Sequence, residues 1–128
     1  MRLVATQIGD FEPDGLSSPE AYADFAEACY DLGFRAYKIH PWRAGASLEL
    51  HIKMVEEVGK RVGDKMDLML DPFCAYKTFG DTIKVGRACD EWGYYWYEDP
   101  LAVDDIFNYV KLKERLEIPI MATENSPG

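Results

Sequence analysis

Three acidic side chains each end an apolar run that has the character of a buried strand. Asp71 ends "MDLMLD", Glu98 ends "YYWYE" and Glu124 ends "IPIMATE". Carboxylates that face one place repel one another strongly unless a cation lies between them. A divalent ion with oxygen ligands removes this conflict, and an all-oxygen ligand set favours Mg²⁺. The three acids are therefore candidate ligands of a magnesium ion.

A basic pair lies on an earlier apolar run. In "YKIH", Lys38 and His40 are two residues apart, so a strand points both side chains to the same side. Two like charges in proximity lower the pKa of each group, and a base that works near neutral pH needs such tuning. Lys38 and His40 are therefore candidate catalytic bases. The alternative for this pair is a lysine that reaches solvent and a hydrogen-bonded structural histidine.

The elements that position these residues alternate along the chain. Apolar runs and helix-start residues predict strands over residues 3–8, 34–40, 65–71, 94–98 and 118–124, and helices over 19–32, 48–62, 79–92 and about 106–116. Such alternation indicates a parallel sheet with right-handed crossovers, whose functional sites lie at the carboxyl ends of the strands. His51 falls on the second helix among charged neighbours, and we expect it to be solvated.

The spacing of the candidate residues matches this repeating unit. Lys38, Asp71, Glu98 and Glu124 are separated by 33, 27 and 26 residues, about one strand and helix each. They therefore take equivalent positions on neighbouring strands, which lie ~4.8 Å apart in a sheet. The competing interpretation is turn chemistry, because Asp71 and Asp99 both precede a proline, and Asp before Pro commonly starts a turn.

The bulk composition excludes several classes of partner. The 128 residues are expected to form one domain, 1–128, with 48% apolar and 29% charged residues. A net charge of −9 argues against nucleic acid and against an anionic membrane surface. The sequence lacks an apolar stretch of ~18 residues and a signal-peptide pattern, so we expect a cytoplasmic protein. Cys29 and Cys89 are expected to be core residues of helices.

The motifs together resemble the enolase superfamily, and within it the mandelate racemase and muconate lactonizing enzyme-like group. The likeness rests on "AYKIH", "MLDP", "WYEDP" and "ATEN", in this order and at this separation, over roughly residues 30 to 128. It implies a (β/α)₈ TIM barrel, so that this α/β chain carries about five of the eight units. The residues it implies are Asp71, Glu98 and Glu124 as Mg²⁺ ligands, Lys38 and His40 as the catalytic pair, and Asn125 as a substrate contact.

The resemblance also implies a reaction. Its shared step is removal of the proton α to a carboxylate of a small molecule, with Mg²⁺ holding the carboxylate and stabilising the enediolate. Dehydration of a sugar acid or racemisation of a hydroxy acid would follow, and an acid-sugar dehydratase is our first expectation. The sequence departs from the family at two places: His40 stands where a second lysine is usual, and Phe73 stands where an asparagine is usual.

The length of the chain bears on its assembly. A complete barrel needs ~250 residues, so we expect the N-terminal part of a barrel, with the family's capping domain and strands 6 to 8 absent. An open arc would leave strand edges unpaired and bare an inner layer that includes Met69, Trp96 and Ile120. Exposed edges and apolar patches drive association, so we expect a homo-oligomer or pairing with a complementary barrel fragment.

Two alternatives to an enzyme stay open at this point. Five such units also describe a flavodoxin-like receiver module, in which Asp71 would accept a phosphoryl group and Asp10 and Glu12 would hold Mg²⁺. A receiver needs Ser or Thr after the fourth strand and Lys after the fifth, where this chain has Glu98 and Glu124. Strand order separates the two folds, because an arc of a barrel runs 1-2-3-4-5 and a receiver runs 2-1-3-4-5. The second alternative is a non-catalytic barrel fragment that acts as an assembly unit.

Overall fold

Five strands and four helices alternate in the computed structural model, which describes residues 4–8 (backbone only), 16–42, 46–102 and 104–122. The strands are β1 (Val4–Ile8), β2 (Ala36–His40), β3 (Asp67–Leu70), β4 (Trp96–Glu98) and β5 (Ile120–Met121). The helices are α1 (Pro19–Asp31), α2 (Leu48–Val62), α3 (Phe79–Glu91) and α4 (Ile106–Arg115).

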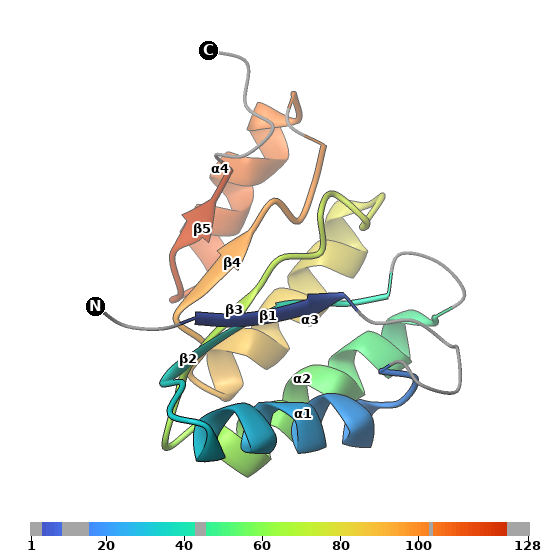
Figure 1. Cartoon of the computed structure of the whole chain (residues 1–128). Coiled ribbons are helices and arrows are strands. Elements are labelled where there is room, and N and C mark those ends of the chain that lie inside the picture. The colour runs from blue at the N-terminus through green and yellow to red at the C-terminus, as the bar shows by residue number, and fades with distance from the viewer. Residues whose placement is uncertain (1–3, 9–15, 43–45, 103, 123–128) are drawn as a thin grey trace.

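The strands form a single parallel sheet in the order β1-β2-β3-β4-β5 (Figure 1). Each strand lies beside the next one in the chain, with a helix in the connection between them. This order confirms the prediction of a barrel arc and contradicts the receiver alternative, whose first two strands would be exchanged. The fold is therefore a partial (β/α) barrel.

The hydrophobic core lies between the sheet and the helices, which Figure 1 shows on the same side of the sheet. One row of buried side chains crosses four strands, because Leu70 is in register with both Ile39 and Tyr97, and Tyr97 with Ile120. Side chains in register on neighbouring parallel strands point to the same face. The expectation that Ile120 faces the inner layer is therefore wrong, since it belongs to the helix-side core.

The opposite face of the sheet carries the candidate chemistry. Lys38 is in register with Met69, and Met69 with Trp96, so these three side chains form a row on the inner face. Met69 is only 2% exposed and Trp96 is half-buried, so the inner layer is less bare than the sequence suggested. Because strand residues alternate between faces, His40 and Glu98 follow on this same inner face, one step closer to the carboxyl ends.

Polar side chains fix where the helices begin. Ser18 accepts a hydrogen bond from the backbone N–H of the third helical residue of α1, and Ser47, Thr78 and Asp105 do the same for α2, α3 and α4. Such N-caps satisfy backbone donors that have no partner within the helix, each contributing about 1 kcal/mol. The caps therefore set the length of the loop between each strand end and the next helix.

His51 is buried, so the expectation that it is solvated is wrong. Its side chain lies on α2 and is 4% exposed, with Nδ1 2.9 Å from the hydroxyl of Tyr76 in the segment after β3. Burial lowers the pKa of His51 to about 4, because a charged ring would lose its hydration. His51 is thus a neutral residue that joins α2 to the loop after the next strand.

Two further expectations concern cysteines and membranes. Cys29 and Cys89 are buried on α1 and α3, as predicted for core residues, and burial raises the pKa of both thiols. Within the described part of the chain, none of the helices has the length and apolar character needed to cross a membrane.

Candidate metal centre

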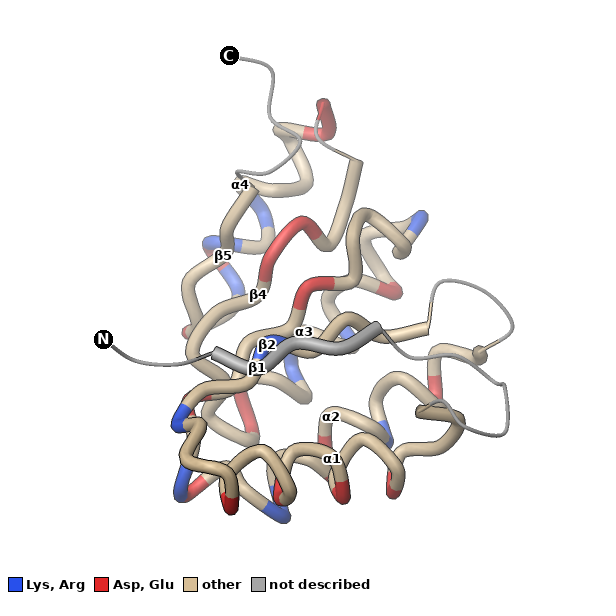
Figure 2. Tube along the Cα trace, viewed as in Figure 1, with Lys and Arg blue, Asp and Glu red and all other residues tan. Residues whose placement is uncertain are grey.

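Two strand ends bring the first two candidate ligands together. Asp71 directly follows β3 and Glu98 ends β4, and the register of Leu70 with Tyr97 sets these acids side by side. In Figure 2, acidic positions lie close together near the end of β4. Both are buried, with 0% and 6% of the residue exposed. A carboxylate oxygen of each lies within 4.8 Å of the other. The matched sequence spacing thus corresponds to real proximity for this pair.

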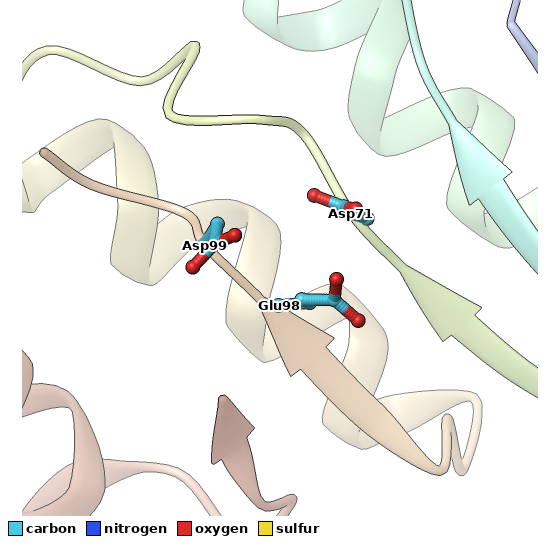
Figure 3. Close-up of side chains that lie close together, drawn as sticks. All are labelled: Asp71, Glu98 and Asp99. Atoms are coloured by element: carbon cyan, nitrogen blue, oxygen red, sulfur yellow. The ribbon is translucent and has the colours of Figure 1, made fainter. Parts of the chain in front are cut away.

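Asp99 is a third acid at the same place, and it was not among the predicted ligands, since it entered only the competing interpretation of turn chemistry. It is fully buried, and one of its carboxylate oxygens lies within 4.8 Å of those of Asp71 and Glu98 (Figure 3). Adjacent strand residues normally point to opposite faces, but Asp99 has a φ of 44° and so leaves the extended conformation. The sequence feature that could have indicated Asp99 as a site residue is the pair of adjacent acids in "YEDP".

Backbone hydrogen bonds hold Asp99 in this conformation. Its N–H donates to the carbonyl oxygen of Met121 at 2.7 Å, and its carbonyl oxygen accepts from the N–H of Cys74 at 2.6 Å. The end of β4 is therefore tied on one side to β5 and on the other to the loop after β3. These two ties position the acid doublet between its neighbouring segments.

Glu124 and Asn125 lie outside the described residues. The strand position in register with Glu98 is occupied by Met121, and Glu124 follows three residues later in the chain. Their roles as third metal ligand and substrate contact therefore stay predictions.

Lys38 and His40 face the acids from the neighbouring strand. Lys38 Nζ lies 3.6 Å from a Glu98 oxygen and 4.0 Å from an Asp71 oxygen, and His40 Nδ1 lies 3.7 Å from the same Asp71 oxygen. Both basic side chains are partly exposed, at 26% and 20%, whereas the acids are buried. The structure thus places the candidate bases at the solvent-accessible side of the candidate metal ligands.

The electrostatic balance at Asp71 disfavours its ionised form. Burial, and after it the neighbouring charge of Glu98, raise the pKa of Asp71 to about 7. The backbone N–H of Phe73, which donates to Asp71 Oδ1 at 3.1 Å, and the charge of Lys38 oppose this rise in pKa. A proton or a cation is therefore needed to satisfy the carboxylate at neutral pH.

The donor set fits a hard divalent cation. Asp71 Oδ2 is buried and has no hydrogen-bond donor among the described residues, so its lone pairs are available for a cation. One oxygen of Glu98 accepts from Trp96 Nε1 at 3.0 Å, which leaves the other oxygen directed to the Lys38 side. Clustered carboxylate oxygens are ligands that Mg²⁺ prefers. Asp71 and Glu98 are thus suited to bind Mg²⁺.

Comparison with known proteins identifies the family. The model of the enolase C-terminal domain-like family matches residues 21–128, which is most of the chain. The structure superposes on D-glucarate dehydratase from Agrobacterium tumefaciens, complexed with magnesium, with a TM-score of 0.91. That match has 27% sequence identity and covers 99% of this chain and 34% of the other.

Two curated relatives catalyse different reactions, according to their names. The N-succinyl-L-Arg/Lys racemase of Bacillus cereus is 24% identical over 109 residues, which cover 85% of this chain and 29% of the racemase. The arabinonate dehydratase of Saccharolobus solfataricus is 29% identical over 102 residues, covering 78% of this chain and 26% of the dehydratase. The chain thus spans less than a third of either relative. It belongs to the enolase superfamily, in the group of mandelate racemase and muconate lactonizing enzyme.

Proposed function

We propose that this chain carries the metal-binding half of an active site that removes the proton α to the carboxylate of a small molecule. The observation that supports it most directly is the meeting of Lys38 and His40 with Asp71 and Glu98 on one face of the sheet, at 3.6 to 4.0 Å. Acid and base groups so arranged can hold a carboxylate and accept a proton beside it.

The acids would hold the metal. Asp71 and Glu98 are the described ligands of this proposal, and Glu124 is the third. Bound Mg²⁺ would supply a Lewis acid that stabilises negative charge on the substrate carboxylate. Asp99, buried beside both described ligands, adds negative charge that would strengthen the attraction for a cation.

Lys38 and His40 would have different roles, one in binding the substrate and the other in accepting the proton. The Lys38 ammonium lies nearest to Glu98, so it is suited to bind the carboxylate of the substrate next to the metal ligands. His40 would accept the α-proton, because imidazole is the side chain whose ordinary pKa suits a base near neutral pH. Its Nδ1 faces Asp71, whose negative charge would stabilise the imidazolium that forms.

A sugar acid is the substrate class that we propose first. Two of the similar proteins are named as dehydratases of arabinonate and D-glucarate, and both substrates are hydroxylated carboxylic acids. In such a substrate, loss of the β-hydroxyl after removal of the α-proton gives net dehydration. Racemisation is the alternative outcome of the same first step, since it returns the proton to the opposite face.

Proton exchange tests the proposal. The chain is incubated in D₂O with Mg²⁺ and arabinonate or D-glucarate, and the α-proton signal is followed by NMR. We expect the signal to decline with the wild-type chain, to persist with His40→Asn, and to decline normally with Lys53→Met, an exposed lysine on the outer side of α2.

Metal binding is measured separately on the same samples. Mn²⁺, a spin probe for an oxygen-rich Mg²⁺ site, is titrated and the free ion is followed by electron paramagnetic resonance. If the chain binds Mn²⁺ through Asp71 but exchanges no α-proton, the result argues against catalysis by this chain. The alternative of a non-catalytic assembly unit would then remain. If Lys38→Met abolishes exchange while His40→Asn does not, the roles of the two bases are reversed.

A further inference from the structure

A cavity lies away from the acids, between the segments that follow β2 and β3. Its volume is about 200 Å³, and its walls come from these two segments and from the first turns of α2 and α3. Trp42 and Leu48 contribute apolar surface, whereas His51, Lys77 and Asp81 contribute polar groups. The acids of the candidate metal centre do not line it. The proposed catalytic role accordingly does not account for this cavity.

The ring of His51 is fixed in orientation at the cavity wall. Its Nδ1 lies 2.9 Å from the Tyr76 hydroxyl, and the His51 and Tyr76 rings meet edge to face with centroids 5.5 Å apart. Trp42 also meets the imidazole edge to face, with centroids 5.8 Å apart. The hydrogen bond and the two ring contacts together favour this orientation of the imidazole.

The remaining ring nitrogen is the one offered to the cavity. Among the described residues, His51 Nε2 has no hydrogen-bond partner, although the side chain is 96% buried and lines the cavity. The phenol of Tyr76 is more acidic than a neutral imidazole N–H, so we assign the Tyr76 O–H as the donor of this hydrogen bond and Nδ1 as its acceptor. Neutral His51 then carries its one proton on Nε2, which makes this atom a fixed donor toward a ligand.

The charged residues of the cavity define what this donor can bind. The Lys77 ammonium is exposed at the rim and forms no salt bridge within the described part of the chain. Asp81, also at the rim, lies in the first turn of α3 and would repel an anion. A fixed N–H donor and an ammonium together favour an acceptor with negative charge, and the apolar wall favours a hydrocarbon part.

We propose that this cavity binds a small carboxylate that carries a single ring or a short apolar chain. The carboxylate would accept from His51 Nε2 and from Lys77, while the apolar part would lie against Trp42 and Leu48. The volume is below the ~300 to 1,000 Å³ of pockets for drug-sized ligands, which restricts the ligand to roughly ten non-hydrogen atoms. The site is independent of the proposed reaction, because its residues and its probe differ from those of the metal centre.

Benzoate and its neutral counterpart benzamide are the probes that test this site. The chain is labelled at its two histidines with ¹⁵N, and the imidazole signals are followed by NMR while either compound is added at pH 7.5 with EDTA. We expect benzoate to shift the His51 signals with a Kd of roughly 1 mM, as suits a ligand of this size. We expect benzamide to bind at least fivefold more weakly, since it lacks the charge.

Three exposed or half-exposed positions provide matched variants. Lys77→Gln is expected to weaken benzoate binding at least threefold, and Asp81→Asn to strengthen it about twofold by removing a like charge. Lys53→Gln, which changes an exposed lysine away from the cavity, should leave the Kd unchanged. Circular dichroism melts confirm that each variant is folded.

Several results would overturn the proposal. Equal affinity for benzamide and benzoate would reject the carboxylate, and an unchanged Kd in Lys77→Gln would reject the cavity as its place. Shifts confined to His40 would assign benzoate to the metal centre instead of the cavity. Saturation absent up to 50 mM benzoate would mean that the cavity binds no such ligand.

Discussion

At the scale of single residues, the features of Asp71 that favour metal binding also lower the stability of the metal-free folded chain. Its carboxylate is fully buried, lies near two further acids and has an oxygen without a hydrogen-bond donor among the described residues. A buried polar atom without a partner costs about 1 to 3 kcal/mol. This cost is offset when a cation binds, so the folded chain and the metal are thermodynamically linked.

Asp71→Asn separates the cost of the buried carboxylate in the metal-free chain from the stabilisation that a bound cation provides. Asn Oδ1 can keep the hydrogen bond from the Phe73 N–H, and its amide can donate to Glu98, so the like-charge conflict disappears. We expect the metal-free variant to be more stable than wild type by about 1 kcal/mol. We also expect it to lose the rise in Tm that 10 mM MgCl₂ gives the wild-type chain. Thermal melts with and without MgCl₂ measure both effects.

A remote acid supplies the control for this experiment. Glu117→Gln removes an equal charge from an exposed position near β5, away from the cluster, and should keep the response to Mg²⁺. If Mg²⁺ raises the Tm of Asp71→Asn as much as that of the wild type, Asp71 is not a ligand.

His51 leads to a prediction for the dependence of stability on pH. Its pKa falls from 6.5 to about 4 in the folded chain because of burial, so the unfolded chain binds the proton more readily between these values. His51 therefore supports full stability above pH 6.5, and this part of the stability is lost as the pH falls toward 4. The slope contributed by one such proton is at most about 1.4 kcal/mol per pH unit.

Urea unfolding at half-unit steps between pH 4 and 7 measures this slope. His51→Gln removes the titrating ring while an amide can still bond to Tyr76, so its stability should depend less steeply on pH than that of the wild type. His40→Asn, the change of the other histidine, should leave the slope attributed to His51 in place. Parallel slopes for His51→Gln and the wild type would contradict the assignment.

The residues that sequence reasoning placed correctly differ in kind from those it missed. Asp71 and Glu98 were brought together because strand ends repeat at a fixed spacing in a parallel sheet. Asp99 was missed because its proximity depends on a local φ of 44°, which alternation along a strand does not predict. His51 was missed because its partner, the Tyr76 hydroxyl, lies 25 residues later in the chain.

At the scale of elements, helix and strand positions were largely readable from periodicity and caps. The predicted helix over 48–62 is α2, but periodicity alone did not predict every side chain that it buries. Leu48 and Ile52 are only half-buried, whereas His51 and Met54 are buried. Packing against α1 and α3 selects the buried face, and no helix contains that information in its own sequence. The same limit explains the wrong face assigned to Ile120.

The contact between α2 and α3 is close enough to exclude a methyl group. A Cβ added at Gly59 on α2 would lie 2.7 Å from Cβ of Trp92, the C-cap residue that follows α3. That atom is next to the backbone and cannot move independently, so the helices would have to separate. We expect Gly59→Ala to lower the free energy of unfolding by about 1 to 3 kcal/mol, measured by urea denaturation.

Gly80→Ala is the matched control on α3. There the nearest heavy atom to an added Cβ is 3.9 Å away, so only helix propensity changes. We expect Gly80→Ala to raise stability by up to about 1 kcal/mol. A neutral Gly59→Ala would mean that the helices adjust without cost, contrary to the close contact.

At the scale of the whole molecule, the arc has one end where unpaired backbone and apolar surface lie near each other. Among the described strands, β5 pairs only with β4, so its outer edge has no strand beside it. The neighbouring helix α4 exposes Ile106, Phe107 and Val110 at 70%, 74% and 49% (Figure 1). The inner face is a weaker source of association than we expected, because Met69 is already buried.

Self-association through this end of the arc is the prediction that follows. An open strand edge offers backbone donors and acceptors to another chain, and an adjacent apolar patch adds a driving force. We expect light scattering at micromolar concentration to give a mass above the 14.6 kDa of one chain.

The double variant Ile106→Glu, Phe107→Glu should shift the mass toward the monomer, because burying two carboxylates in an interface is unfavourable. Leu32→Glu, at a position 78% exposed at the end of α1, should leave the mass unchanged. A wild-type chain that is monomeric and melts cooperatively would show that this end of the arc needs no partner, and that the open edge does not govern its assembly.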